Sequence, residues 1–152
     1  MLESNLNIPI HEILLKIHSI TIHISYIAFL ASSIAAVLYL VQDHALKAKL
    51  SGVIFNRLPS LSFLDKLNYR AIGLGFPLLT LSVLSGIIWA KSIHGIYWWG
   101  YNSRQFYSMI LWLVYAVILH VRLSAKLRGR KVALLSIAAF FIIILTLFGT
   151  CP

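Results

Sequence analysis

Four long runs of apolar residues constrain the fold of this chain more than any other feature of its sequence. They lie at about 17–41, 71–90, 106–122 and 132–150. Each run is long enough to cross a hydrocarbon core, which takes about 20 residues at helical rise. A backbone inside lipid must satisfy its own hydrogen bonds, and the apolarity here is continuous rather than alternating. The runs therefore predict helices and not the strands of a barrel.

The composition agrees with this interpretation. Hydrophobic residues make up 60% of the chain and charged residues only 11%, which excludes a soluble domain. The sequence contains no internal repeat and no sign of a second domain. We therefore expect an all-α integral membrane bundle of four transmembrane helices, which forms a single transmembrane domain over residues 1–152.

The cations gather in two of the three connections between the expected spans. Five lie in residues 42–70 and five in residues 122–131, so ten of the thirteen Lys and Arg residues share one side: Lys47, Lys49, Arg57, Lys66, Arg70, Arg122, Lys126, Arg128, Arg130 and Lys131. The positive-inside rule predicts that this side is cytoplasmic and that both termini lie on the outer side. The net charge of +9 then indicates membrane lipid, and no nucleic acid, as a partner.

The connection between the second and third runs is rich in aromatic side chains. Residues 89–107 contain seven of them, with His94 in their midst: Trp89, Tyr97, Trp98, Trp99, Tyr101, Phe106 and Tyr107. Trp and Tyr collect wherever a helix leaves the bilayer, so their enrichment alone is ordinary. Seven in one connection, however, could also form a surface on which a large flat ligand stacks.

Ionisable groups at membrane depth are costly, so the six histidines are the first candidates for a functional site. Imidazole is also a common axial ligand of heme iron. His120 lies about 14 residues into the third run, roughly 21 Å along a helix, and His18 lies at the outer end of the first run. Taken alone, His120 could equally be an interfacial residue near Arg122, and His18 an ordinary residue at a helix end. His11 and His18 are seven residues apart and are expected on one helix face.

Several segments together resemble a known family. They are residues 64–90, residues 112–122, the basic turn 128–130, and the pair Ile17-His18 followed by Ser25-Tyr26. In this order they are similar to the cytochrome c assembly family of heme-handling membrane proteins, in particular its Ccs-type members of system II. The resemblance covers most of the chain and implies a bacterial or archaeal cell membrane protein with the aromatic connection outside.

The resemblance also implies roles for individual residues. His18 matches an outer-face histidine that ligates heme, and His120 matches a histidine that takes part in a heme site inside the bilayer. Four residues fall where the family has its tryptophan-rich motif: Trp98, Trp99, Tyr101 and Asn102. The implied cofactor is heme b, and the implied partners are another cytochrome c assembly membrane subunit and apocytochrome c. The implied function is to hold heme at the outer face for delivery to apocytochrome c, as a component of the attachment system and not as an enzyme on its own.

The motif is degenerate, which leaves alternatives open. Tyr101 replaces a tryptophan and Asn102 replaces the acid, and no second outer histidine follows the fourth run. Candidates for the missing distal ligand are His94, which we prefer, and a residue of a partner subunit, together with His11, His23 and Cys151. The alternative functions are a structural subunit and a b-type heme electron-transfer subunit of a membrane complex.

Overall fold

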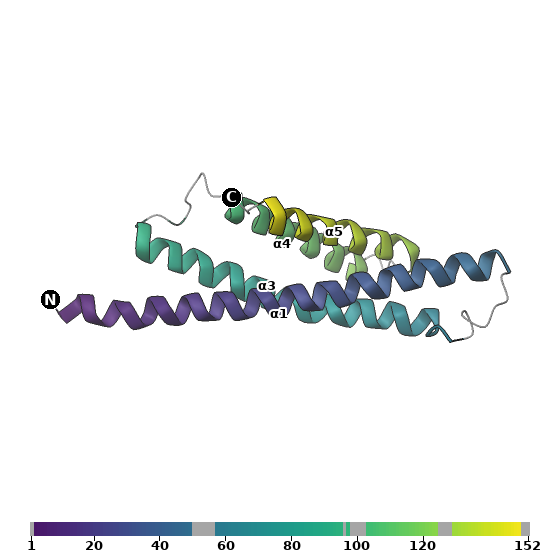
Figure 1. The fold of residues 1–152 in the computed structure, drawn as a ribbon, viewed down its shortest axis with the longest axis horizontal. Coiled ribbons are helices and arrows are strands. Elements are labelled where there is room, and N and C mark those ends of the chain that lie inside the picture. Colours follow the sequence, from purple (N-terminus) through teal and green to yellow (C-terminus); the bar gives the residue numbers. More distant parts are fainter. Residues whose placement is uncertain (1, 50–56, 96, 98–102, 125–128, 150–152) are drawn as a thin grey trace.

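The computed structural model describes residues 2–49, 57–95, 97, 103–124 and 129–149. These residues form four long helices, α1 (Leu2–Lys47), α3 (Leu61–His94), α4 (Ser103–Ser124) and α5 (Arg130–Gly149), and they include no strand (Figure 1). All four helices are long and apolar enough to cross a membrane. The prediction of an all-α fold with four helices that could cross a membrane is confirmed, and the described part of each expected span lies within one helix.

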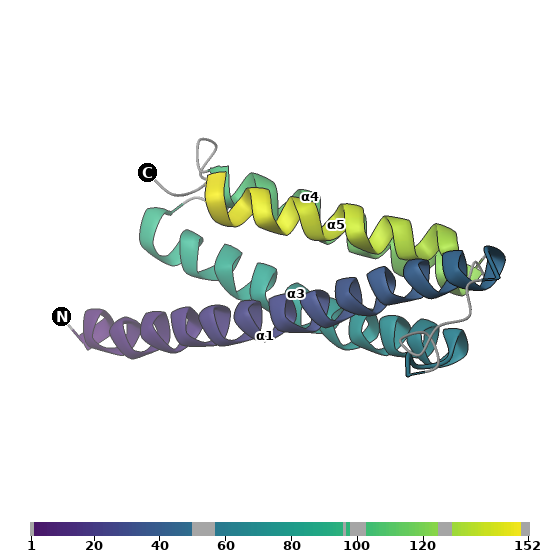
Figure 2. The same ribbon diagram turned by 45° about the vertical axis from the view of Figure 1, so that its right-hand side comes forward.

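The helices run in alternating directions. Figures 1 and 2 show α1 begin, α3 end, α4 begin and α5 end at the same end of the bundle. The opposite end, which we call the basic end, joins α1 to α3 and α4 to α5. Because the two cation-rich connections are these two, the fold keeps the charge asymmetry of the sequence at one end. The side of the membrane on which this end lies remains a prediction.

The helices differ in length, and this matters for where a site can lie. At about 1.5 Å per residue, the 46 residues of α1 extend over roughly 69 Å, whereas the 20 residues of α5 extend over roughly 30 Å. A hydrocarbon core is about 30 Å thick. Figure 1 shows α1 reaching past the other helices at both ends, so part of α1 lies beyond the core whatever the depth of the bundle.

The ends of α3 have clear local causes. At its start, the Ser60 side chain accepts a hydrogen bond from the backbone N–H of Phe63. At its end, Gly95 adopts a left-handed conformation with φ of 70°, and its N–H donates to the carbonyl of Lys91. Pro77 lies inside the helix and cannot donate a backbone hydrogen bond. Figures 1 and 2 show the C-terminal half of α3 at an angle to α1, rising toward the side of the bundle on which α4 and α5 lie.

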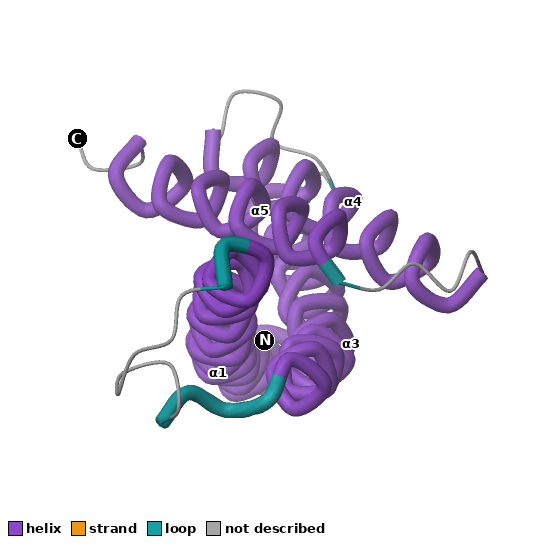
Figure 3. Tube along the Cα trace, turned by 90° about the vertical axis from the view of Figure 1, so that its right-hand side faces the viewer, coloured by secondary structure: helices purple, strands orange, loops and turns teal. Residues whose placement is uncertain are grey.

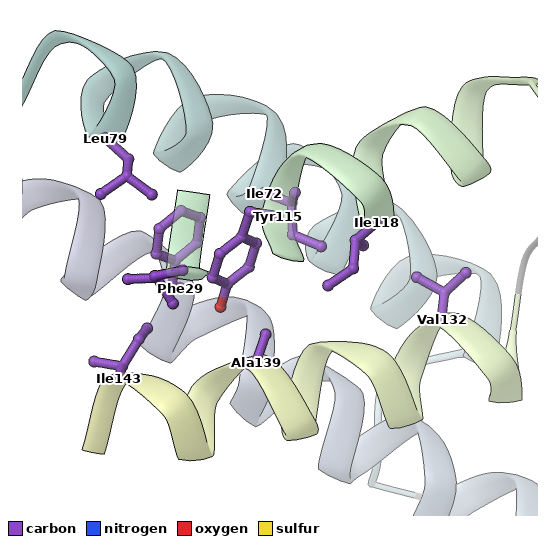
Figure 4. Close-up of a cluster of buried hydrophobic side chains, with 9 residues drawn as sticks. Phe29, Ile72, Leu79, Tyr115, Ile118, Val132, Ala139 and Ile143 are labelled. Atoms are coloured by element: carbon purple, nitrogen blue, oxygen red, sulfur yellow. The ribbon is translucent and has the colours of Figure 1, made fainter. Parts of the chain in front are cut away.

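Figure 3 views the bundle from one end and shows α1 and α3 as neighbours, with α4 and α5 lying across one side of the pair. The apolar core fills this junction (Figure 4). Its centre is the ring of Phe29, which stacks on Tyr115 with centroids 3.6 Å apart and planes 10° apart. On α3, Gly75 leaves room for the same ring, since a Cβ there would lie 2.6 Å from Phe29 Cε1. The aromatic pair thus joins α1, α3 and α4.

A buried polar network ties the four helices together nearer the basic end. Arg122 of α4 donates from Nη1 to Asn68 Oδ1 at 2.9 Å and forms an ion pair with Asp65 Oδ2, also at 2.9 Å. The Asn68 amide donates to Ser32 of α1 and to Ser136 of α5. The charge pattern of the sequence predicts Arg122 at the start of a cytoplasmic connection, but the structure buries it within α4, where its charge is paired.

Candidate functional site

His18 of α1 packs against α3, about two thirds of the way along that helix. Its Nδ1 lies 2.8 Å from the backbone oxygen of Ser82 and 3.1 Å from the Ser82 hydroxyl. A carbonyl oxygen can only accept, so the proton of the neutral imidazole belongs on Nδ1. Among the described contacts, no hydrogen bond reaches Nε2, which therefore keeps a lone pair that can bind a metal.

A glycine allows this close approach. A Cβ built on Gly86 would lie 3.0 Å from Nδ1 and 3.1 Å from Cε1 of His18. Ser82 and Gly86 are one helical turn apart, so a hydrogen-bond acceptor and a bare stretch of backbone meet the same imidazole. The sequence analysis missed both residues. The signal that could have found them is the spacing of two small residues four apart, which marks close helix packing in membranes.

His11 lies at the same contact between α1 and α3, two helical turns before His18. Its Nδ1 is hydrogen-bonded to the Ser92 hydroxyl of α3, and that hydroxyl donates in turn to the carbonyl of Trp89 at 2.7 Å. The prediction that His11 and His18 share one helix face is confirmed, since both contact α3. Seven residues of helix separate them by roughly 10 Å along the axis. His11 as the distal partner of His18 stays a prediction, and its Nδ1 is engaged by Ser92.

The remaining histidine of α1 in this region points elsewhere. His23 is exposed, and its Nδ1 is hydrogen-bonded to the carbonyl of Ser19 one turn earlier on the same helix. No described hydrogen bond joins it to α3 or to His18. The distal ligands that the sequence leaves open within this chain stay predictions: His11, His23, His94 and Cys151.

His94 is in the last turn of α3, half-buried, and meets the Trp89 ring edge-on with centroids 6.5 Å apart. Nearby, the Lys91 ammonium donates to the Tyr97 hydroxyl and lies 4.0 Å from the Tyr97 ring centroid. The other predicted site residues of this loop, Trp98, Trp99, Tyr101 and Asn102, lie outside the described residues, as does Cys151. Within the described residues, no three His, Cys, Asp or Glu side chains gather where they could hold a metal ion.

His120 is far from His18. It is exposed on α4, with Nε2 3.4 Å from the Ser124 hydroxyl, whereas Arg122 two residues later faces the bundle and reaches Asn68. Asn68 and the Ser82 partner of His18 are 14 residues apart on α3, or roughly 21 Å along the helix. His18 and His120 therefore cannot share one iron atom, and a b-type heme held between these two residues does not fit the structure.

The fold and its histidines define a multi-pass membrane protein in which an imidazole is held between two helices with one ring nitrogen available. The model of the family described as Cytochrome C assembly protein matches residues 2–151, so the chain belongs to this family. This confirms the resemblance read from the sequence.

Relatives support the same assignment. The chain is similar to the cytochrome c biogenesis protein CcsA of Prochlorococcus marinus (strain NATL1A), at 45% identity over 86 residues, or 57% of this chain and 27% of the relative. CcsA of Chlamydomonas reinhardtii is 34% identical over 132 residues, 85% of this chain and 35% of the relative. CcsA of Guillardia theta is 33% identical over 150 residues, 89% and 50%. The chain thus spans between about a quarter and a half of the length of these curated relatives. No solved structure matches the chain.

Proposed function

We propose that this chain is a heme-handling membrane subunit of cytochrome c biogenesis, which holds heme at the outer membrane face for delivery to apocytochrome c. Membership of the cytochrome c assembly family supports the pathway. The state of His18 is the single observation that carries the heme proposal, because its Nδ1–H is engaged by Ser82 while no described hydrogen bond reaches Nε2. This is the arrangement that metal-ligating histidines usually have.

The described residues fit heme b at the His18 end of the α1–α3 pair. Bound heme would supply an iron atom whose axial position takes an imidazole nitrogen. His18 would provide that nitrogen through Nε2, and the loop after α3, with Trp98, Trp99, Tyr101 and Asn102, would pack against the porphyrin faces. His94, at the start of this loop, remains our preferred second ligand. Another membrane subunit of the assembly system is the alternative source.

His120 belongs to a second contact in this proposal. It is exposed on α4 and faces away from the other helices. A heme that it contacts within the membrane would therefore lie at the periphery of the helix bundle and not inside it. The distance of roughly 21 Å along α3 between the two histidine positions requires two separate heme positions. This separation supports movement of heme across the membrane better than permanent binding between His18 and His120.

The orientation is part of the proposal, because His18 must face the side on which apocytochrome c is matured. The basic end is expected to be cytoplasmic. In a Cys151→Ser background, Ser92→Cys should react with a membrane-impermeant maleimide added outside intact cells, and Lys131→Cys should react only after the cells are opened. The reverse labelling pattern would reject delivery at the outer face.

Heme binding is tested by the Soret absorbance of the purified protein, expressed with adequate heme and with its partner subunit. His18→Gly should lose the outer heme, and added imidazole should restore the absorbance by filling the vacated position. His44→Gly is the matched control, since His44 is exposed in the last turn of α1 at the basic end. A wild-type protein without Soret absorbance, copurifying with a large complex, would reject heme handling in favour of a structural subunit.

Retention of the Soret band in His18→Gly without imidazole would reject His18 as the ligand. His120→Gly tests the second contact separately and should lower the heme content. In the double variant with His18→Gly, added imidazole should restore absorbance as it does in His18→Gly alone.

A further inference from the structure

We propose that the backbone carbonyl of Ser82 and the bare backbone at Gly86 are positioning residues for His18, which together fix its protonated nitrogen and the plane of its ring. The identity of the ligand that Nε2 binds rests on the proposed function. The positioning itself is a property of the chain without heme, so it can be measured independently.

The tautomer follows from the kind of acceptor at Ser82. The carbonyl oxygen has no proton to give, so it holds the imidazole with hydrogen on Nδ1. The Ser82 hydroxyl is also near, 3.1 Å from Nδ1 and 3.3 Å from the carbonyl oxygen of His18. A hydroxyl can donate or accept, so it permits either tautomer. The main-chain oxygen of Ser82 is therefore the group that fixes the tautomer of His18, and it is present whatever side chain stands at position 82.

The ring plane follows from the steric limit at Gly86. The Cβ of any other residue there would lie 3.0 Å from Nδ1 and 3.1 Å from Cε1, closer than such atoms normally approach. Gly73, on the same helix, has nothing within 4 Å of an added Cβ. Gly73 is exposed, whereas Gly86 is half-buried and meets the imidazole of His18.

A positioned imidazole matters more in lipid than in water. His18 is half-buried between two apolar helices, where an N–H without an acceptor is costly. Holding the proton on Nδ1 removes that cost and leaves Nε2 ready, so no tautomer exchange or ring rotation is needed when the ligand arrives. Loss of such an outer contact typically lowers metal affinity by about 10–100-fold.

Two matched variants test the proposal, Gly86→Val and Gly73→Val, because they place the same β-branched residue in the same helix. Nitrogen-15 NMR of histidine-labelled protein without heme reports which ring nitrogen carries the proton. In wild type and Gly73→Val, His18 should show a protonated Nδ1. In Gly86→Val its signals should shift, and heme affinity measured by Soret titration should fall by about 10–100-fold.

Ser82→Ala keeps the proposal testable if Gly86→Val does not fold. Because the backbone carbonyl remains, Ser82→Ala should keep the Nδ1 proton and bind heme within about threefold of wild type. An Nε2-protonated His18 in wild type, or an unchanged His18 signal in Gly86→Val, would overturn the proposal. Normal His18 signals in a protein that binds no heme would instead reject the proposed function and leave the positioning in place.

Discussion

Replacement of Arg122 by methionine should destabilise the bundle, because it removes one partner from a buried ion pair. The Arg122 side chain is only 6% exposed and that of Asp65 is 19% exposed. Arg122 makes three close contacts with α3: the Asp65 carboxylate at 2.9 Å, the Asp65 carbonyl at 2.7 Å and Asn68 Oδ1 at 2.9 Å. Without the guanidinium, the carboxylate and the amide oxygen lose their strongest partner.

The magnitude follows from the burial of the pair. Removing one member of a buried ion pair costs about 3–5 kcal/mol, because the other charge stays buried and uncompensated. Asp65 keeps some exposure and also accepts a hydrogen bond from the Gly129 N–H at 3.3 Å, so we expect about 3 kcal/mol for Arg122→Met. Asp65→Asn with Arg122→Met should cost clearly less than the sum of the two single changes, because no charge is then left alone.

The assay is reversible unfolding in mixed micelles of mild detergent and dodecyl sulfate, followed by far-ultraviolet circular dichroism. Arg70→Met is the control, because Arg70 is an exposed cation on the same helix and should change the free energy of unfolding by no more than about 0.5 kcal/mol. If Arg122→Met stayed within that range, or if the double variant equalled the sum of the single ones, the ion pair would not stabilise the bundle as argued.

Four further substitutions test the core by the same assay. Gly75→Ala should destabilise by about 1–3 kcal/mol because its Cβ would overlap the Phe29 ring, whereas Gly73→Ala, which meets nothing, should be neutral or stabilising by up to about 1 kcal/mol; equal effects would contradict the overlap. Tyr115→Phe should raise stability by about 1 kcal/mol, since the buried hydroxyl has no described partner, and a loss would indicate one. Trp112→Phe should cost about 1 kcal/mol through the lost indole hydrogen bond to a threonine of α3, and an unchanged value would reject that bond.

Much of the fold could be predicted because hydropathy reports directly on membrane helices. Four apolar runs predict four helices, and helical periodicity alone places His11 and His18 on one face. The helix that packs against this face of α1 could not be predicted from sequence. Pairing between helices depends on crossing angles and close packing, which the sequence of one helix does not determine. The contacts of His18 with Ser82 and Gly86 therefore emerge only from the structure.

Arg122 shows a second limit of reasoning from sequence. A cation at the end of an apolar run is usually counted with the positive connection that follows. Here α4 continues to Ser124, and Arg122 in its last turn faces α3, where Asp65 supplies the opposite charge. The two residues are 57 apart in the chain, so neither the burial of the charge nor its partner could be recognised from local patterns.

The distribution of polar contacts along α3 separates what holds the bundle together from what serves the proposed function. Near the basic end, Asn68 links α1, α4 and α5 through buried hydrogen bonds. Toward the other end of the bundle, where α1 lies beside the part of α3 that follows Ser82, the described side chains of α1 from Ile10 to Ile24 are all exposed or half-buried. Sites roughly 21 Å apart with no shared partner should respond independently. Stability variants at Arg122 should therefore leave the His18 tautomer unchanged, which makes the two parts of the structure separately testable.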